Sequence, residues 1–160
     1  MSSPTVPYLI RPSRWYDLFA IHRLVDTTYD PLVERYKIPR FPQRTKYFRM
    51  ICSGRLWVLQ SQRKLVGMIT LVDDSDRLWV GLLTVLPNFQ RQGFGRALIE
   101  FAESEARRRG MKELVLDTLE RLPDAFSFHQ RLGFAEIDRQ ERYGQIYILM
   151  TKRVSAWPRT

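Results

Sequence analysis

The sequence predicts one α/β domain of the α+β type, with a mixed and mostly antiparallel sheet of about six to seven strands flanked by helices. Three consecutive runs of branched and aromatic residues, separated by short polar turns, are typical of an antiparallel meander. A long amphipathic segment then leads to another apolar run, which is the pattern of a crossover helix between parallel strands. The chain has 160 residues and no linker-like segment, so we expect a single domain.

The N-terminal third is predicted to be mainly helical. Residues 8–11 can form a short edge strand, and Ser13 suits the N-cap of a helix that reaches about Asp26. Residues 27–53 contain three prolines, the first of which is Pro31. Because proline disrupts a helix interior, we expect this segment to break into short helices and loops.

The middle of the chain carries the meander. Strands are predicted at residues 56–60, 65–72 and 78–85. The third run is almost continuously apolar up to Pro87. We therefore expect it to be a central strand that is covered on both faces.

The C-terminal half alternates helices and strands. The predicted elements are a helix over residues 94–109, a strand over 113–118, a helix over 123–132 and a hairpin of 134–138 with 145–154. Gly110 and Gly133 suit the positions just after the two helices. The strand that follows the crossover helix should pair in parallel with its neighbour.

Composition excludes several classes of protein. No stretch of eighteen apolar residues is present, which argues against a transmembrane helix, so we expect no membrane partner. Residues 1–7 lack the charged and apolar blocks of a secretory signal, and we therefore expect a cytoplasmic location. Cys52 is the single cysteine and no Cys or His cluster has ligand spacing, so we expect no metal.

The charge balance points to an anionic partner. The chain has 26 basic and 17 acidic residues, which makes its formal charge +9. Residues 35–72 contain nine Lys or Arg and no Asp or Glu. Such a stretch can be a solvated basic face, or it can be a surface for nucleic acid or for an acidic substrate.

The segment that joins the central strand to the long helix carries the most chemical information. Gly93 and Gly95 at a helix start let backbone N–H groups approach a ligand, and the helix dipole favours negative charge there. Arg91 and Arg96 flank these amides, so the segment suits a diphosphate. The Gly-Lys-Ser/Thr of a nucleotide P-loop is missing, and Leu98 replaces the third glycine of a dinucleotide fingerprint. The alternative is a tight turn that only starts the helix.

Two linked motifs in this region follow the pattern of a known family. Leu-x-Val-x-Pro at residues 83–87, followed by Gln-x-x-Gly-x-Gly at 90–95, resembles the coenzyme A motif of the GNAT superfamily of N-acetyltransferases. Leu-Val-Leu-Asp-Thr at 114–118 and Ala-Phe-Ser-Phe-His-Gln-Arg-Leu-Gly-Phe at 125–134 are similar to the next strand and helix of that family. The resemblance covers about residues 56–154, and the N-terminal third matches only in outline.

The resemblance implies an architecture and a cosubstrate. A domain of this family has a sheet that splays at the central strand and binds acetyl-coenzyme A. Residues 55–154 would form the coenzyme-binding core of the single domain 1–160. Residues 1–54 would supply acceptor-side helices and loops, and residues 155–160 would form a tail.

The resemblance also implies which residues contact the coenzyme. The backbones of Leu83 and Val85 would pair with the pantetheine arm, and an N–H near Leu83 or Thr84 would face the thioester oxygen. Such an oxyanion donor is typically worth about 3 to 4 kcal/mol. Phe128 would line the channel of the arm. The residues implied for the diphosphate are Gln90, Arg91, Gln92, Gly93, Phe94, Gly95 and Arg96.

The position of the general acid departs from the family pattern. His129 stands where the family commonly has a tyrosine that protonates the leaving thiolate. An imidazole can donate a proton near neutrality, so His129 can keep this role, or it can merely fill the helix face. Tyr143, in the predicted last hairpin, is the alternative donor.

The position of the general base departs as well. Gly81 stands where many relatives carry a glutamate. Deprotonation of the amine would then go through water or through a carboxylate elsewhere, and proximity of the amine to the thioester could carry much of the catalysis. The weak candidates for the base are Asp76, Asp117 and Glu120.

One main hypothesis and two alternatives follow. The main hypothesis is an acetyl-coenzyme A dependent N-acetyltransferase that acts on a primary amine by direct attack, with a small molecule or a peptide or protein as acceptor and no nucleic acid. One alternative is a non-catalytic sensor or scaffold that binds coenzyme A, and the other is a basic protein associated with ribosomes or nucleic acid. Arg40, Arg44 or Arg49 could clamp a carboxylate of the acceptor. Trp157 could dock on its own domain or on a partner in a homodimer.

Overall fold

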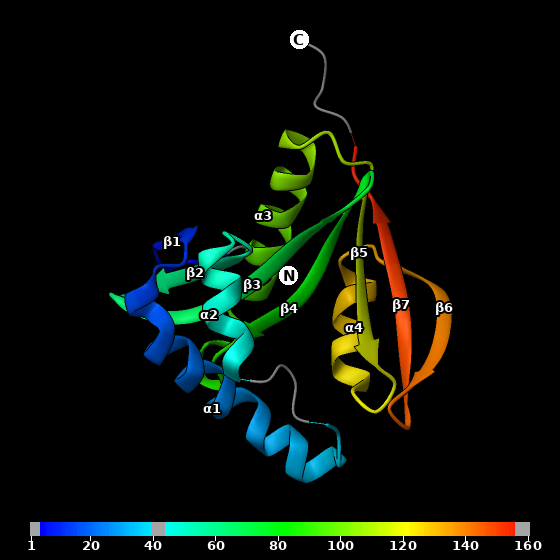
Figure 1. Cartoon of the computed structure of the whole chain (residues 1–160), viewed down its shortest axis with the longest axis horizontal. Coiled ribbons are helices and arrows are strands. Elements are labelled where there is room, and N and C mark those ends of the chain that lie inside the picture. Colours follow the sequence, from blue (N-terminus) through cyan, green and yellow to red (C-terminus); the bar gives the residue numbers. More distant parts are fainter. Residues whose placement is uncertain (1–3, 40–43, 156–160) are drawn as a thin grey trace. The chain divides into compact units, whose positions relative to one another are not determined.

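The computed structural model describes residues 4–39 and 44–155. Within these ranges, two helices precede a run of three strands, and helices and strands then follow in turn up to a C-terminal pair of strands (Figure 1). The elements are β1 (Tyr8–Pro12), the 3-10 helix η1 (Trp15–Asp17), α1 (Leu18–Tyr36), α2 (Arg44–Cys52), β2 (Leu56–Ser61), β3 (Lys64–Asp74), β4 (Arg77–Val85), the 3-10 helix η2 (Pro87–Phe89), α3 (Phe94–Arg108), β5 (Glu113–Leu119), α4 (Pro123–Arg131), β6 (Ala135–Arg142) and β7 (Gln145–Arg153).

The strands form one mixed sheet in the order β1-β2-β3-β4-β5-β7-β6. Neighbours pair antiparallel at β1–β2, β2–β3, β5–β7 and β6–β7, whereas β4 and β5 run parallel. The predicted fold class, the edge position of β1, the central position of β4 and the parallel crossover are all confirmed. The crossover is parallel because α3 returns the chain to the end of the sheet at which β4 began.

The chain divides into two compact units. The first unit comprises Met1–Leu71 and Leu82–Phe101, and the second comprises Val72–Gly81 and Ala102–Thr160. The functional division predicted from the sequence has its boundaries after residues 54 and 154. These boundaries differ from those of the two compact units, and the functional division stays a prediction.

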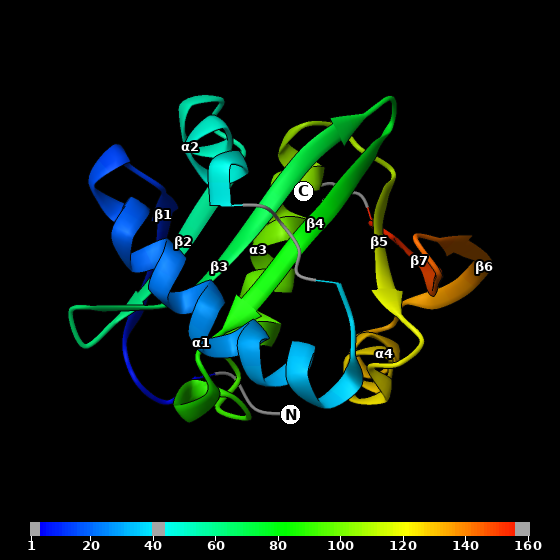
Figure 2. The same cartoon turned by 60° about the horizontal axis from the view of Figure 1, so that its bottom comes forward.

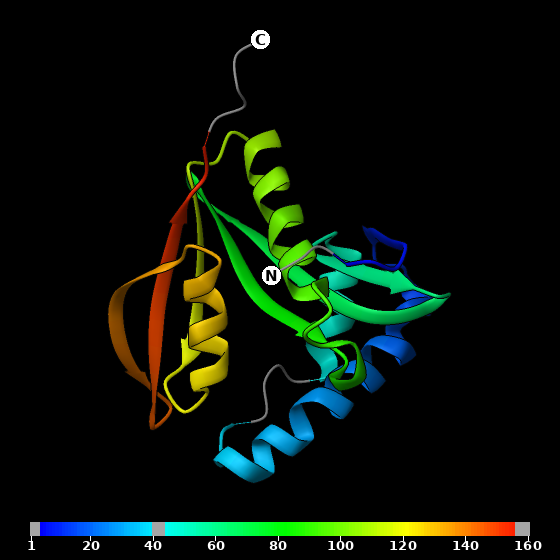
Figure 3. The same cartoon turned by 180° about the vertical axis from the view of Figure 1, so that it is seen from behind.

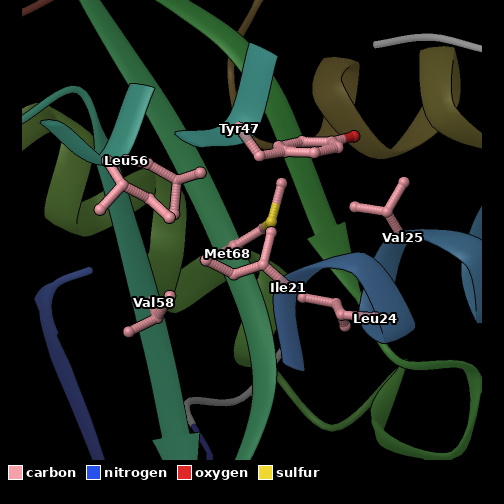
Figure 4. Close-up of a cluster of buried hydrophobic side chains, with 8 residues drawn as sticks. Ile21, Leu24, Val25, Tyr47, Leu56, Val58 and Met68 are labelled. Carbon is pink, nitrogen blue, oxygen red and sulfur yellow. The ribbon is translucent and has the colours of Figure 1, made fainter. Parts of the chain in front are cut away.

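The core of the first unit lies between two helices and the sheet. In this unit α1 and α2 cover one face of β2 and β3, and the start of α3 lies on the other face (Figures 2 and 3). Apolar side chains from α1, α2, β2 and β3 meet there (Figure 4). The buried members of this cluster, which we call the helix-side core, are Ile21, Leu24, Val25, Tyr47, Ile51, Leu56, Val58 and Met68. Burial of such side chains is the main force that holds the helices on the sheet.

Helix α1 is longer than the sequence predicted. It continues from Leu18 to Tyr36 through Pro31, where the pattern indicated short helices and loops. Proline lacks an N–H and removes one backbone hydrogen bond. Packing of Ile21, Leu24 and Val25 against the sheet supports the helix as a whole, because tertiary burial contributes more to helix stability than local preference does.

The start of the first helix also differs from the prediction. Ser13 is not the N-cap, because its buried hydroxyl donates a 2.8 Å hydrogen bond to the carbonyl of Leu56 in β2. The carboxylate of Asp17 instead accepts a 2.7 Å hydrogen bond from the amide of Arg14. Arg11 then donates to both oxygens of Asp17, at 2.8 and 2.9 Å. The capping group is therefore a buried carboxylate held by an arginine.

The second unit follows the predicted order with one longer strand. Gly110 and Gly133 have φ values of 71° and 90°, as expected for residues just after α3 and α4. Strand β6 extends to Arg142, beyond the predicted end at 138, and is exposed along nearly its whole length. Its polar sequence lacks the apolar residues by which a strand is predicted, and such polarity is common in a strand at the edge of a sheet.

Candidate active site

At the end of β4, the backbone N–H groups of every second residue point toward β3. The amide of Leu82 donates a 2.7 Å hydrogen bond to the hydroxyl of Thr70, and the amide of Leu86 donates a 2.9 Å bond to the carbonyl of Val66. Both acceptors belong to β3. Because N–H and C=O groups point the same way at every second residue of a strand, the even positions of this segment face β3.

The odd positions of the same segment face the opposite way. Pairing of β4 with β5 ends at Val80 and Leu116, although both strands continue. The amides of Leu83 and Val85 therefore point to a strand edge beyond the paired stretch, as the predicted pairing with an extended ligand requires. By the same alternation, the amide of Leu83 rather than that of Thr84 faces this edge.

The loop after β4 is coiled tightly against the strand end. The side-chain amide of Gln90 donates a 2.9 Å hydrogen bond to the carbonyl of Val85. Arg91 has a φ of 60° and Gly93 a φ of 87°. Left-handed residues within a short loop turn successive amides toward one side and make a concavity that suits an anion. A left-handed conformation at a non-glycine residue is strained, and such strain is common at binding sites.

Helix α3 begins with amides that lack helical acceptors. The first bond of the helix runs from the amide of Ala97 to the carbonyl of Gly93, at 2.9 Å. The amides that precede it, up to Arg96, lie before the start of the helical bonding pattern. Phe94 anchors this start: it is 1% exposed, and its ring centroid lies 6.1 Å from those of Tyr8 and Phe89. The helix dipole adds partial positive charge at the same place.

Two arginines supply full positive charge near these amides. Arg91 is exposed, and Arg96 in the first turn forms a 2.8 Å ion pair with Glu100. The first turn of α3 contains no acidic residue. The loop and helix start thus fit the diphosphate predicted from the sequence, although Arg96 would share its charge between Glu100 and a ligand.

In the second unit, His129 is buried among aromatic rings. It is 9% exposed and makes edge contacts with Phe128 and Phe134, at centroid distances of 5.1 and 5.7 Å. Burial lowers the pKa of His129 to about 4. The imidazole is therefore neutral at pH 7, and a general-acid role requires its pKa to rise in the reacting complex. Its Nδ1 has no hydrogen-bond partner within the described part of the chain.

The other predicted proton donor has different surroundings. Tyr143 lies in the turn between β6 and β7, is 80% exposed and has a φ of 54°. The structure thus places both candidates in the second unit, His129 enclosed and Tyr143 exposed.

The candidate bases are all engaged in ion pairs. Gly81 is exposed and carries no side chain that could take a proton. The pairs are Asp117 with Arg142 at 2.5 Å, Glu120 with Arg139 at 2.5 Å, and Asp76 with Lys112 at 2.9 Å. Lys112 lowers the pKa of Asp76. A carboxylate stabilised in this way is a weaker base.

Some predicted contacts fall outside the described residues. Arg40 and Trp157 lie there, and of Arg44 only the backbone is described. Arg49 in α2 is exposed. Within residues 4–39 and 44–155, no helix is long and apolar enough to cross a membrane, and no three His, Cys, Asp or Glu side chains gather into a group that could hold a metal ion.

One contact was not indicated by the sequence. Tyr29 in α1 lies near Thr84 in β4: burial raises the pKa of Tyr29 to about 12, and the Thr84 hydroxyl opposes this rise. Tyr29 stood out only as one of several aromatic residues between positions 27 and 53, for which core packing was the simplest interpretation. Its helical position became visible only with the extension of α1.

With this geometry established, the family follows from comparison with known proteins. Residues 18–134 match the model of the acetyltransferase (GNAT) family. This match covers more than half of the chain and includes β4, the loop at residues 90–93, α3 and α4. The chain belongs to the GNAT family of acetyltransferases.

Two relatives illustrate the similarity. N-acetyltransferase 8 of Homo sapiens is 32% identical over 118 residues, which cover 70% of this chain and 49% of the relative. The [ribosomal protein bS18]-alanine N-acetyltransferase of Escherichia coli is 36% identical over 61 residues, which are 38% of this chain and 41% of that protein. The chain spans about half the length, or less, of these two relatives.

Solved structures confirm the fold. The crystal structure of the ribosomal-protein-S18-alanine N-acetyltransferase from Escherichia coli matches with a TM-score of 0.76 at 21% identity, over 95% of this chain and 97% of that chain. PaiA N-acetyltransferase from Thermoplasma acidophilum, in complex with coenzyme A, matches with a TM-score of 0.79 at 17% identity, over 92% and 99% of the two chains.

Proposed function

We propose that this protein is an N-acetyltransferase that transfers the acetyl group of acetyl-coenzyme A to a primary amine by direct attack. The observation that carries the proposal is the strand-to-helix segment from Leu83 to Arg96. It combines an open strand edge, left-handed residues at Arg91 and Gly93, and amides that precede the first helical hydrogen bond. Membership of the acetyltransferase family makes acetyl-coenzyme A the ligand to expect there.

The binding roles follow from the direction of each group. The amides of residues 92–96, together with Gln90 and Arg91, would hold the diphosphate. The amides of Leu83 and Val85 would pair with the pantetheine arm, as an added strand pairs with a sheet edge. The carbonyl of Val85 is already engaged by Gln90, so the arm would bind through the remaining groups. Phe128 would contribute an apolar wall to the channel.

The catalytic contribution of the chain would be orientation and oxyanion binding. The bound coenzyme supplies an activated acetyl thioester. The amide of Leu83, aimed at the edge of β4, would stabilise the tetrahedral oxyanion, an effect typically worth about 3 to 4 kcal/mol. Holding the amine beside the thioester can contribute about 7 to 11 kcal/mol more. Water would accept the proton of the amine, because β4 offers no carboxylate and the three candidate acids are ion-paired.

His129 and Tyr143 remain the two proposed general acids for the leaving thiolate. His129 occupies the motif position but is neutral at pH 7 in this environment. Tyr143 carries an O–H donor in an exposed turn. His129→Phe and Tyr143→Phe separate them: the acid is the residue whose loss lowers kcat while coenzyme affinity stays within twofold.

Coenzyme binding is the first test of the proposal. Calorimetric titration with acetyl-coenzyme A should give saturable binding, and Gly93→Glu should abolish it, because a side chain at φ 87° strains the loop and its carboxylate repels the diphosphate. Gly54→Glu is the matched control, since Gly54 also has a positive φ of 67° and open space around its Cβ position. Absence of binding to the parent protein would reject the proposal.

Turnover is the second test. Thiol release is measured with a panel that contains amino acids, polyamines, and peptides with free N-terminal amines, including peptides that begin with alanine, the residue named for the Escherichia coli relative. At least one amine should be acetylated, with the product identified by mass. Tight binding without turnover on any amine would instead support a non-catalytic coenzyme A sensor, which the missing carboxylate at Gly81 favours.

A further inference from the structure

A buried side chain of β3 serves as a hydrogen-bond acceptor for the backbone of β4. The amide of Leu82 donates a 2.7 Å hydrogen bond to the hydroxyl of Thr70. In an antiparallel pair, such an amide ordinarily bonds to a backbone carbonyl of the neighbouring strand. Thr70 is 2% exposed, so water does not compete for this bond. The position of Leu82 therefore depends on one particular side chain.

The face on which this hydroxyl lies follows from the pairing of β2 with β3. Thr70 stands opposite Leu56, and Met68 stands opposite Val58. The side chains of Leu56, Val58 and Met68 all belong to the helix-side core (Figure 4). Directly opposite residues share a face of the sheet, so Thr70 lies on the face that α1 and α2 cover. The amide of Leu82 therefore tilts out of the plane of the strands toward that face.

The tilt of Leu82 sets the direction of the next amide. Successive N–H groups of a strand point to opposite sides, so the amide of Leu83 tilts toward the other face of the sheet. The start of α3 lies on that other face (Figure 3). Under the proposed function, the Leu83 amide stabilises the oxyanion and the amides at the start of α3 hold the diphosphate. The bond to Thr70 thus turns both sets of donors toward the same side.

A second residue of β3 determines the position of the next peptide group of β4. A Cβ atom on Gly67 would lie 3.1 Å from the carbonyl oxygen of Thr84 and 3.3 Å from Cδ1 of Leu98. Both distances are shorter than ordinary van der Waals contacts, so only glycine allows this close approach. The carbonyl of Thr84 and the amide of Val85 belong to one peptide group. Gly67 therefore helps to set where the second amide of the open edge lies.

We propose that Thr70 is a positioning residue that aims the Leu83 amide at the thioester oxygen, and that Gly67 positions the pairing amide of Val85. Each acts through the backbone of β4 rather than through a contact with substrate. Without the hydroxyl, the amide of Leu82 would return toward the plane of the sheet and the amide of Leu83 would turn with it. This inference rests on the proposed function and adds to it the residues that preform the edge of β4.

Thr70→Val tests the first part of the inference. It keeps the shape of the side chain and removes the acceptor. With the most active amine of the panel, kcat should fall about 10- to 100-fold, which is less than the loss of about 10²- to 10³-fold for a complete oxyanion donor. The KM of the amine and the dissociation constant of acetyl-coenzyme A should change by no more than about threefold. Thr70→Ser restores the hydroxyl and should return kcat to within about threefold of the parent.

Thr151→Val is the matched control for a general loss of stability. Thr151 in β7 also bonds to the backbone of a neighbouring strand, since its hydroxyl donates a 3.1 Å hydrogen bond to the carbonyl of Leu114. Kinetics are measured at a temperature at which every variant is fully folded by circular dichroism. Thr151→Val should then keep the kcat of the parent. A fall in kcat that only reflected a weakened sheet would appear in Thr151→Val as well as in Thr70→Val.

Gly67→Ala tests the second part of the inference. Its methyl group has to displace the carbonyl of Thr84 by a few tenths of an ångström, and the amide of Val85 moves with that carbonyl. The dissociation constant of acetyl-coenzyme A should rise about 5- to 10-fold, as for the loss of one hydrogen bond. The kcat at saturating coenzyme should stay within about threefold of the parent. Thr70→Val and Gly67→Ala thus change different parameters, whereas a general loosening of the sheet would change both in each variant.

The outcomes separate this inference from the proposed function. An active parent whose Thr70→Val variant keeps kcat within twofold overturns the role of Thr70, and so does a Thr70→Ser variant as slow as Thr70→Val. A joint loss of kcat and coenzyme affinity in Thr70→Val shows a structural role and also overturns it. Unchanged coenzyme affinity in Gly67→Ala overturns the role of Gly67. A parent that binds no acetyl-coenzyme A, or that acetylates no amine, overturns the proposed function and the inference together.

Discussion

The side-chain amide of Gln90 donates a 2.9 Å hydrogen bond to the carbonyl of Val85. This bond links the first residue of the loop at residues 90–93 to the last residue of β4. It holds the loop in the coiled form in which Arg91 and Gly93 have positive φ. The strand edge and the amides before α3 are thereby kept in a fixed relation before any ligand binds.

Loss of this bond should weaken coenzyme binding. Gln90→Leu keeps the approximate size of the side chain and removes the donor, and we expect the dissociation constant of coenzyme A to rise about fivefold, as for the loss of about 1 kcal/mol. Isothermal titration calorimetry measures the change. Gln140→Leu, at an exposed position of β6, is the control and should bind as the parent does. An unchanged affinity in Gln90→Leu would show that the loop is held by other contacts.

The ion pair at the start of α3 should tune the affinity for the diphosphate. Arg96→Gln should weaken coenzyme A binding about five- to tenfold at low salt and by less at 0.5 M salt, because screening reduces the effect of an exposed charge. Glu100→Gln removes the competing partner of Arg96 and should leave binding equal or tighter. Weaker binding in Glu100→Gln would mean that the pair orients Arg96 rather than competing for it. Titrations at both salt concentrations distinguish these results.

Burial of His129 should make stability depend on pH. The pKa of His129 is lowered to about 4 in the folded protein, whereas an unfolded histidine has a pKa near 6.5. Between these values the unfolded chain binds the extra proton, so stability falls as pH falls from about 6.5 to 4 and this contribution levels off below. From pH 7 to pH 5 the loss should be about 2 kcal/mol.

Urea unfolding at the two pH values measures this loss. His129→Phe removes the titrating group and should reduce the difference in unfolding free energy between pH 7 and pH 5 by about 2 kcal/mol. His22→Phe is a comparison at the other histidine of the chain. Equal pH dependence in the parent and in His129→Phe would contradict the assignment of a buried neutral imidazole.

The capping carboxylate of Asp17 should be important for stability. It is 6% exposed, accepts two hydrogen bonds from Arg11 and caps the amide of Arg14. Asp17→Asn leaves the Arg11 guanidinium without its counter-charge, so we expect the free energy of unfolding to fall by about 2 to 4 kcal/mol. Thermal and urea unfolding give the value. Asp138→Asn in exposed β6 should change it by no more than about 0.5 kcal/mol, and a similar small change in Asp17→Asn would show that the pair is dispensable.

Local patterns determined much of the fold and indicated where the proposed coenzyme site lies. Runs of branched, aromatic and apolar residues predicted β2, β3, β4 and β5, because strand formation depends on which side chains can face a sheet. Gly110 and Gly133, expected just after two helices, have positive φ in the structure, as that position favours. The loop at residues 90–93, which we propose binds the coenzyme, was recognisable for the same reason: its backbone geometry requires particular residues within a short span of sequence.

Only the tertiary structure decided the features that depend on distant contacts. Packing on the sheet stabilises α1 as one helix through Pro31. Burial in the folded protein lowers the pKa of His129 to about 4, well below the ordinary value of a histidine. The hydrogen bond from the Ser13 hydroxyl to the carbonyl of Leu56 joins residues that are far apart along the chain, so no local pattern could indicate it. A sequence specifies the conformational preferences of neighbouring residues directly, whereas burial, dielectric environment and long-range partners exist only once the chain has folded.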